Sequence, residues 1–163
     1  MTKPTSDISN YRACVGVVIF NSKGQVFLGR RRGTKGFWVW QFPQGGMDKG
    51  ETVLEAAYRE LYEETGITEK HVELLGQTED WLYYDLPDER AKRMKWYGQK
   101  QKWVAFRFTG KKKHINLFVE TPSEFSRYAW GNLKDTKHLI VPFKRKVYKD
   151  VAKQFKRFAK PMK

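Results

Sequence analysis

Three glutamates, Glu60, Glu63 and Glu64, have the residue type and the spacing of a metal-binding cluster. On a helix with about 100° per residue, their side chains fall within an arc of roughly 100°. Glutamates three or four residues apart repel each other by roughly a few tenths of a kcal/mol per pair, and no lysine lies between Thr52 and Glu69 to offset this. A divalent cation bound by carboxylate oxygens would remove the repulsion. A solvated acidic face on a surface helix is the alternative that spacing alone leaves open.

The acidic cluster is notable because the chain as a whole is strongly basic. The sequence has 32 Lys and Arg residues against 18 Asp and Glu, a net charge of +14, yet residues 45–67 contain six of the carboxylates. Such a charge favours a polyanionic partner, namely nucleic acid, a nucleotide or an acidic membrane, over a basic surface that serves only solubility. Mg²⁺ typically binds one or two protein carboxylates and fills its remaining positions with water and substrate phosphate. We therefore interpret the acidic helix and the basic surface as complementary parts of one polyphosphate site.

A single helix must present the three glutamates. Thr52 can cap its first turn, Glu55 three residues later completes a capping box, and Gly66 is placed to end the helix in a left-handed conformation. Ala56 and Ala57 are small and are expected to leave space above the cluster. The residues expected to face the core are Leu54, Ala57, Tyr58 and Leu61.

The segment before this helix has the pattern of a hairpin followed by a loop. Residues 15–20 form a short apolar run, which is typical of a buried strand. Residues 21–24 carry a turn signal, and residues 25–31 are the expected returning strand. A Gly-rich, aromatic loop is expected over residues 32–46.

The segment after the helix predicts further strands and a terminal helix. Strands are expected at residues 71–78, 81–85 and 102–108, the last of them half-buried, with a charged loop at 87–98. An apolar residue at every fourth position predicts an amphipathic helix over residues 142–158 that docks onto the body of the protein. These elements together indicate a mixed sheet between helices, and therefore an α/β fold.

Length and composition bound the class of protein. A chain of 163 residues with 40% hydrophobic residues is expected to form one domain over residues 1–163, with its core at about residues 11–158. No apolar run reaches the roughly 18 residues that span a bilayer, residues 1–14 have no hydrophobic signal region, and Cys14 is the only cysteine. We expect a cytoplasmic monomer without a membrane partner.

The acidic cluster belongs to a longer pattern of nine positions at fixed spacing. These are Gly45, Glu51, Arg59, Glu60, Leu61, Glu63, Glu64, Gly66 and Ile67. The pattern resembles the signature of the Nudix hydrolases, which hydrolyse nucleoside diphosphates linked to another moiety. The resemblance implies an α/β/α sandwich, with Glu60, Glu63 and Glu64 as metal ligands and Gly45 among the metal-binding positions. It also implies that Arg59 orients the glutamates by ion pairing, and that Gly45 and Gly46 let their loop pack closely against the helix.

Motifs outside this box narrow the resemblance. The segments WQFPQGG (40–46), GQKQKW (98–103), PSEF (122–125) and PFKRKVY (142–148) are similar to those of bacterial RNA pyrophosphohydrolases and of dinucleoside tetraphosphate hydrolases. The resemblance implies that Glu124 is a further acidic residue near the metal and that Arg31 lies beside the second base. The residues that it places at the substrate phosphates or next to them are Arg12, Gln44, Tyr84, Gln99 and Lys144.

The resemblance implies a reaction and leaves three functions to compare. Water attacks a phosphorus atom with Mg²⁺ as cofactor, or Mn²⁺ in its place, and Glu60 or Glu64 accepts the proton, with Glu124 as the rival base. The first function is removal of pyrophosphate from 5′-triphosphorylated or diphosphorylated RNA, which leaves a monophosphate and promotes mRNA decay. The second is hydrolysis of dinucleoside tetraphosphates or other small nucleotides. The third, a non-catalytic domain that binds nucleotide or RNA, conflicts with the intact box, and the net charge favours RNA.

Overall fold

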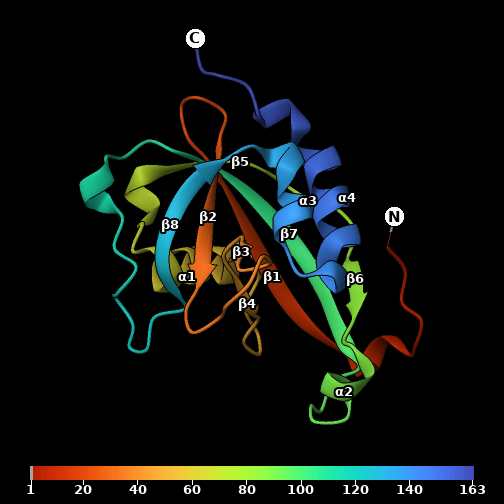
Figure 1. Cartoon of the computed structure of the whole chain (residues 1–163). Coiled ribbons are helices and arrows are strands. Elements are labelled where there is room, and N and C mark those ends of the chain that lie inside the picture. Colours follow the sequence, from red (N-terminus) through yellow and green to blue (C-terminus); the bar gives the residue numbers. More distant parts are fainter. Residues whose placement is uncertain (1) are drawn as a thin grey trace.

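A mixed β-sheet lies between two helical layers in the computed structural model, which describes residues 2–163 (Figure 1). The strands are β1 (Tyr11–Phe20), β2 (Val26–Arg31), β3 (Trp40–Gln41), β4 (Gln44–Gly46), β5 (Val72–Gln77), β6 (Leu82–Asp85), β7 (Gly98–Phe108) and β8 (Phe125–Gly131). The helices are α1 (Val53–Thr65), α2 (Asp88–Ala91), α3 (Thr136–Leu139) and α4 (Arg145–Phe155), and short 3₁₀ turns include η4 (Leu133–Asp135), η5 (Pro142–Lys144) and η6 (Lys156–Phe158).

Strands β1 and β7 form the centre of the sheet. They pair in parallel from Tyr11 opposite Gly98 to Phe20 opposite Arg107. The path of the sheet is β3-β2-β1-β7-β5, with β4 added to β1, β6 added to β7 and β8 added to β2. Because β1 and β7 are covered on both faces, they are long buried strands of the kind found in parallel sheets.

Side chains that alternate along β1 divide the core into two layers. Val15, Val17 and Ile19 pack with α1 on one face of the sheet. Val18 and Phe20 pack on the other face with α4, which contributes its own buried apolar side. The period of two along a strand therefore places α1 on one side of β1 and α4 on the other (Figure 1).

Several predicted elements are confirmed, with small shifts at their ends. The hairpin over β1 and β2, strands β5 and β6, helix α1 and the terminal helix all form. The terminal helix is a regular α-helix only over α4, with the 3₁₀ turns η5 and η6 at its two ends.

Three of the predicted descriptions are wrong. The strand at residues 102–108 is not half-buried, because residues 103–107 are all buried between β1 and the helical layers. The charged segment 87–98 is not only a loop, since it contains α2 and since Gly98 begins β7. The loop over residues 32–46 likewise contains β3 and β4, whose pairing with β2 and β1 has no local signal.

Helix α4 is tied to the chain that leads into the Gly-rich segment. The buried hydroxyl of Tyr148 accepts a hydrogen bond from the backbone N–H of Phe42 at 2.9 Å. The two rings stack with 4.8 Å between their centroids. Because Phe42 lies two residues before Gln44, this contact fixes the position from which β4 begins.

Tyr148→Phe is expected to destabilise the protein by about 1–3 kcal/mol, because the N–H of Phe42 would remain buried without a partner. The matched control is Tyr62→Phe on α1, where the ring is exposed and the change should stay within about 0.5 kcal/mol of wild type. Urea unfolding of both variants measures the difference. Equal midpoints for Tyr148→Phe and wild type would show that the contact contributes nothing to stability.

Candidate active site

Helix α1 holds the glutamates at the edge of its buried face. The hydroxyl of Thr52 accepts the backbone N–H of Glu55 at 3.1 Å, and Gly66 ends the helix with a φ of 72°, so both predicted caps are confirmed. Ala56 and Ala57 are fully buried in the core, so the prediction that they leave space above the cluster is wrong. Their small size instead lets α1 approach the sheet closely. The helix period then leaves Glu60 and Glu64 buried and Glu63 half-buried.

Arg59 is the cation at the centre of this cluster. Its Nη1 donates to Glu60 at 2.8 Å and to Glu63 at 3.2 Å. Its Nε and Nη2 donate to Glu51 at 2.6 and 2.8 Å, and this pairing lowers the pKa of Glu51 to about 2. Arg59 is therefore the counter-ion of the repelling glutamates. The resemblance implied this ion pairing, whereas the absence of lysines from this part of the sequence did not indicate it.

Glu64 is the carboxylate that Arg59 does not contact. It accepts one hydrogen bond, from the backbone N–H of Gln44 at 3.1 Å. Burial raises its pKa well above the usual range, and the charges of Glu60 and Glu124 raise it further. Burial also raises the pKa of Glu60, although Arg59 acts in the opposite direction. Negative charge is therefore concentrated here beyond what the protein's own cations offset.

These side chains suit a hard divalent cation by their chemistry. Carboxylate oxygens are the ligands of Mg²⁺ and related ions, and a cation would offset the charge at Glu64 that no basic side chain contacts. Within residues 2–163, however, no three acidic, His or Cys side chains are already gathered as a complete metal site. The arrangement is therefore a set of candidate ligands held by Arg59 rather than a closed cage.

The Gly pair in β4 allows the backbone to pass close to the cluster. A Cβ atom at Gly45 would overlap the carboxylate of Glu60, and one at Gly46 would overlap the guanidinium of Arg12. The carbonyl oxygen of Gly46 accepts a hydrogen bond from Arg59 at 2.8 Å. A larger residue at either position would displace the end of the Glu60 or the Arg12 side chain. The Gly45 contact is the close approach to the helix that the resemblance implied.

A chain of glutamines extends from β4 across the central strands. The side chain of Gln101 donates to Gln44 and to Gln99, each at 3.0 Å. Arg12 lies opposite Gln99 in the pairing of β1 with β7. The structure therefore brings together Arg12, Gln44 and Gln99. Gln101, which is buried, was not singled out from the sequence, although it lies two residues after Gln99 and so shares its face of the strand.

A second group of predicted residues forms a basic cluster at the start of α4. The Lys144 ammonium lies 5.4 Å from the ring centroid of Tyr84, and Tyr84 pairs with Gln99 across β6 and β7. Lys144 is half-buried, and its pKa is lowered to about 8 by desolvation and by the charges of Arg31 and Arg90. Several cations thus face one another, an arrangement that an anion would stabilise. Arg90 was not predicted as a site residue, because the sequence of the charged loop does not show that the loop folds back towards Lys144.

Arg31, whose charge acts on Lys144 in this basic cluster, has an unsatisfied hydrogen-bond donor. Its Nη2 donates to the carbonyl oxygen of Trp38 at 2.9 Å. Its Nε is buried and has no hydrogen-bond partner. A buried donor without a partner lowers the stability of the fold. This nitrogen is therefore available to a hydrogen-bond acceptor on a bound ligand.

Glu124 lies between the acidic and the basic groups. It directly precedes β8, and its charge raises the pKa of Glu64 and opposes the lowering at Lys144. An acidic residue that sequence reasoning missed, Glu120, acts similarly on Glu60 and raises its pKa. Both side chains are exposed and come from the segment that precedes β8.

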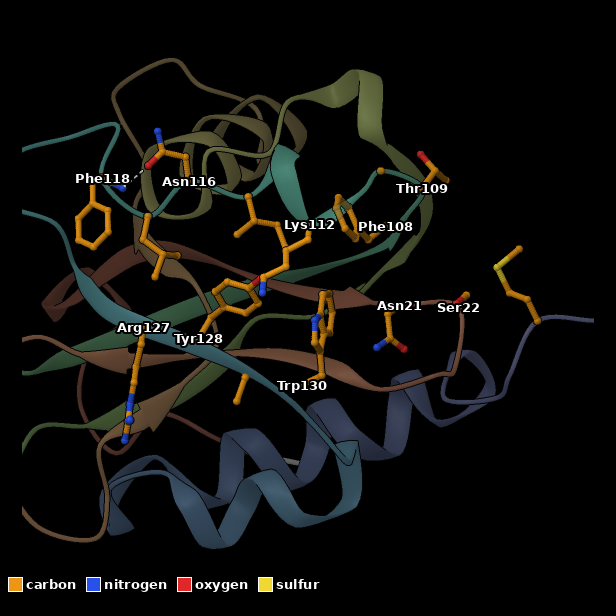
Figure 2. Close-up of a pocket in the computed structure, with 15 residues that line it drawn as sticks. Asn21, Ser22, Phe108, Thr109, Lys112, Asn116, Phe118, Arg127, Tyr128 and Trp130 are labelled. Atoms are coloured by element: carbon orange, nitrogen blue, oxygen red, sulfur yellow. Dashed lines mark hydrogen bonds between the residues drawn. The ribbon is translucent and has the colours of Figure 1, made fainter.

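A separate cavity of about 980 Å³ contains none of these residues. Figure 2 shows Tyr128 and Trp130 of β8 beneath the segment that carries Lys112 and Asn116. Its aromatic lining residues are Phe108, Phe118, Tyr128 and Trp130. The predicted site residues therefore gather around the edge of the sheet near α1 and the start of α4, and not in this hollow.

The arrangement of α1, β4 and the central strands is found in a known family. A model of the NUDIX domain matches residues 10–151. The chain belongs to the Nudix family. Solved structures share the fold: the *C. elegans* Ap4A hydrolase binary complex has a TM-score of 0.64 at 17% identity and covers 90% of this chain and 98% of its own. The predicted α/β/α sandwich is confirmed.

Nudix proteins of higher sequence identity include several named RNA pyrophosphohydrolase. The chain is 49% identical over 158 residues to that of *Caulobacter vibrioides* (strain NA1000 / CB15N), a match that covers 94% of this chain and 91% of the relative. It is 48% identical over 161 residues to that of *Bradyrhizobium diazoefficiens*, covering 91% of this chain and 94% of the relative. The similarity therefore extends well beyond the Nudix box.

Glu64→Gln is expected to stabilise the metal-free protein at neutral pH. The pKa of Glu64 is higher in the folded state than in the unfolded chain, so between those two values the folded protein binds more protons. Stability is then full below the unfolded pKa of about 4.3 and falls as pH rises through the folded pKa, by about 1.4 kcal/mol per unit of separation. A neutral amide at residue 64 removes this loss and can still accept the N–H of Gln44.

Urea unfolding in EDTA, from about pH 4 to about pH 8, measures this effect. The matched control is Glu73→Gln on β5, where the side chain is exposed. Glu64→Gln should gain stability over wild type increasingly as pH rises, whereas the control should follow wild type. Parallel curves for all three proteins would contradict the assignment of a buried, charge-strained carboxylate at residue 64.

Proposed function

We propose that this protein is an RNA pyrophosphohydrolase that removes pyrophosphate from the 5′ end of triphosphorylated or diphosphorylated RNA. The observation that carries the proposal is the placement of a basic cluster, in which Arg31 and Arg90 act on Lys144, near an acidic cluster whose Glu64 accepts only a backbone hydrogen bond. A polyphosphate bound together with a divalent cation complements both. Relatives named RNA pyrophosphohydrolase, about half identical over most of the chain, support this choice of substrate.

The acidic residues would hold the cation. Divalent cations generally serve this family, and we propose Mg²⁺, with Mn²⁺ as a substitute. Its ligands would come from Glu60, Glu63 and Glu64, with Glu124 and the backbone of Gly45 beside them. When bound, the cation supplies positive charge that stabilises the charge developing on the phosphate oxygens.

The chain's own side chains would bind the phosphates and move the proton. Arg12 and Lys144 bring positive charge to the polyphosphate, and the Gln44–Gln101–Gln99 chain offers hydrogen bonds beside them. Arg59 is a positioning residue, since it holds Glu60 and Glu63 in place. We assign the role of general base to Glu64, because its carboxylate is not paired with Arg59 and can accept the proton of the attacking water.

The proposed substrate determines the setting in which the protein would act. Among residues 2–163, no helix is long and apolar enough to cross a membrane. RNA with a 5′-triphosphate is the product of transcription, and we therefore place the protein in the cytoplasm. Conversion of the 5′ end to a monophosphate would promote decay of the mRNA.

Wild-type protein is expected to release pyrophosphate from RNA labelled at its 5′-triphosphate and to leave 5′-monophosphorylated RNA. Glu64→Gln should lower the rate by about 10²–10⁴-fold, the contribution of a general base, whereas Glu73→Gln should keep wild-type activity. Chromatography of the labelled products measures both. Diadenosine tetraphosphate is assayed beside the RNA.

The two substrates separate the proposal from its rival. Hydrolysis of diadenosine tetraphosphate without release of pyrophosphate from RNA would replace RNA with a small nucleotide as the substrate. Binding of either compound without hydrolysis, at saturating Mg²⁺, would overturn the assignment of enzymatic activity. Full activity in Glu64→Gln would reject residue 64 as the base and leave the choice of substrate intact.

A further inference from the structure

A groove of about 1030 Å³ lies outside the proposed active site, and half of the residues that line it are lysines. It runs between α4 on one side and the η4–α3 segment on the other, and the chain after η6 closes one end. Leu133 and Ala152 are among its few apolar lining residues. The lysines that line it include Lys134, Lys137, Lys146, Lys149, Lys153 and Lys156.

The lysines of α4, together with the first residue of η6, form one continuous stripe. They occur at intervals of three, four and three residues from Lys146 to Lys156, which places them within an arc of roughly 80° on a helix. The opposite face of α4 is fixed by its buried apolar residues, which are Val147, Val151 and Phe155 together with Tyr148. Packing of that face into the core therefore directs the lysine stripe outward into the groove.

Lysines outnumber acidic residues by seven to one among the residues that line the groove. Asp150 is the one acidic residue among those that line it, and its carboxylate accepts the backbone N–H of Thr2 at 3.1 Å. Lysines three or four residues apart repel one another, so a bound polyanion would relieve a repulsion that the fold leaves in place.

The near end of the groove lies at the start of α4, where Lys146 is two residues after Lys144. Arg145 directly follows Lys144, and its Nε donates to the carbonyl oxygen of Lys137 at 2.9 Å, which joins the end of α3 to the start of α4. Lys137 and Lys146 line the near end of the groove. From Lys146 to Lys156 the stripe extends about 15 Å along the helix. A strand held by its 5′ phosphates at Lys144, whose ammonium lies on the Tyr84 side of the helix, would pass around the start of α4 to reach this groove.

We propose that this lysine groove binds the ribose-phosphate backbone of the RNA downstream of its 5′ end. The inference rests on the proposed function, because it extends the same substrate from the active site over α4. Lysine ammonium groups act as flexible point charges that suit a phosphate chain without reading its sequence. The groove has small apolar lining residues rather than the aromatic anchors typical of a protein interface, which favours RNA over an acidic protein. RNA length, and not RNA sequence, should therefore control the contribution of the groove.

The test compares the salt dependence of kcat/KM for two triphosphorylated RNAs with the same first two nucleotides. One is a dinucleotide, and the other is a single strand of about 20 nucleotides. The logarithm of affinity falls with the logarithm of salt concentration by about 0.7 per phosphate neutralised on a single strand. Wild-type protein is expected to show a slope steeper by about 2 for the longer RNA, which corresponds to about three phosphates held in the groove.

The variant reverses three groove charges, Lys149→Glu, Lys153→Glu and Lys156→Glu. The matched control reverses three exposed lysines outside the groove, Lys70→Glu, Lys111→Glu and Lys113→Glu, so that both proteins change net charge equally. The groove variant should lower kcat/KM for the longer RNA at least about tenfold at low salt and bring its slope to that of the dinucleotide. Its activity on the dinucleotide should stay near that of the control.

The remaining outcomes distinguish a failure of the groove proposal from a failure of the proposed function. Equal slopes for the two RNAs in wild type, or equal losses in the groove variant and the control, would reject the groove as an RNA site while hydrolysis of the dinucleotide upholds the proposed function. Absence of pyrophosphate release from either RNA would reject the proposed function itself. If the groove variant keeps wild-type slopes but no longer sediments with vesicles of anionic phospholipid, the groove binds a membrane surface and the RNA proposal is wrong.

Discussion

The concentration of carboxylates at the edge of a buried helix face is the constraint on which the rest of the site depends. Glu60 and Glu64 are buried on α1, where ionised groups are unfavourable unless an opposite charge or a hydrogen bond compensates them. Arg59 compensates Glu60 together with Glu63 and Glu51. Glu64 keeps only a backbone hydrogen bond from Gln44, so the fold retains a local excess of negative charge that suits a cation.

The central strands connect this acidic cluster on α1 to the basic cluster around Lys144. The parallel pairing of β1 with β7 places Arg12 opposite Gln99, and the pairing of β7 with β6 places Tyr84 opposite Gln99 in turn. Tyr84 then contacts Lys144 at the start of α4. A register shift of one residue in β7 would turn Gln99 and Gln101 to the other face of the sheet. The acidic and basic halves of the site are thus held together by the same register that buries the core.

Local patterns predicted the elements whose own residues determine them. The caps of α1 at Thr52 and Gly66, the buried run in β1 and the apolar period of α4 each have a signal within a few residues, and each is present in the structure. Strands β3 and β4 were missed because they have only two and three residues and form by pairing with β2 and β1. Strand β8, which pairs with β2, was also missed although it has seven residues, three of them aromatic. The burial of β7 was underestimated for the same reason, since its neighbours lie far away in the sequence.

Site residues, like strands and helices, were predicted where the signal lies within a few residues and were missed where it depends on distant parts of the chain. The glutamates of α1 were found from spacing, and the resemblance to Nudix hydrolases supplied the candidates on other elements, including Lys144 and Glu124. The proximity of Arg90 to Lys144, and of Glu120 to Glu60, depends on how two loops fold back and has no counterpart in a local pattern. Gln101 is different, because its alternation with Gln99 along one strand was a usable signal.

Divalent-ion binding tests most directly the claim that excess carboxylate charge on α1 forms a metal site. Thermal unfolding of EDTA-treated protein is measured with increasing Mg²⁺ or Mn²⁺, for wild type, for Glu60→Gln/Glu64→Gln and for the exposed control Glu69→Gln/Glu73→Gln. Wild type and the control should gain about 2.7 kcal/mol at an ion concentration a hundredfold above Kd, while the α1 variant gains none. A melting temperature of wild type that does not move with the ion, or that rises equally in all three proteins, would contradict the account.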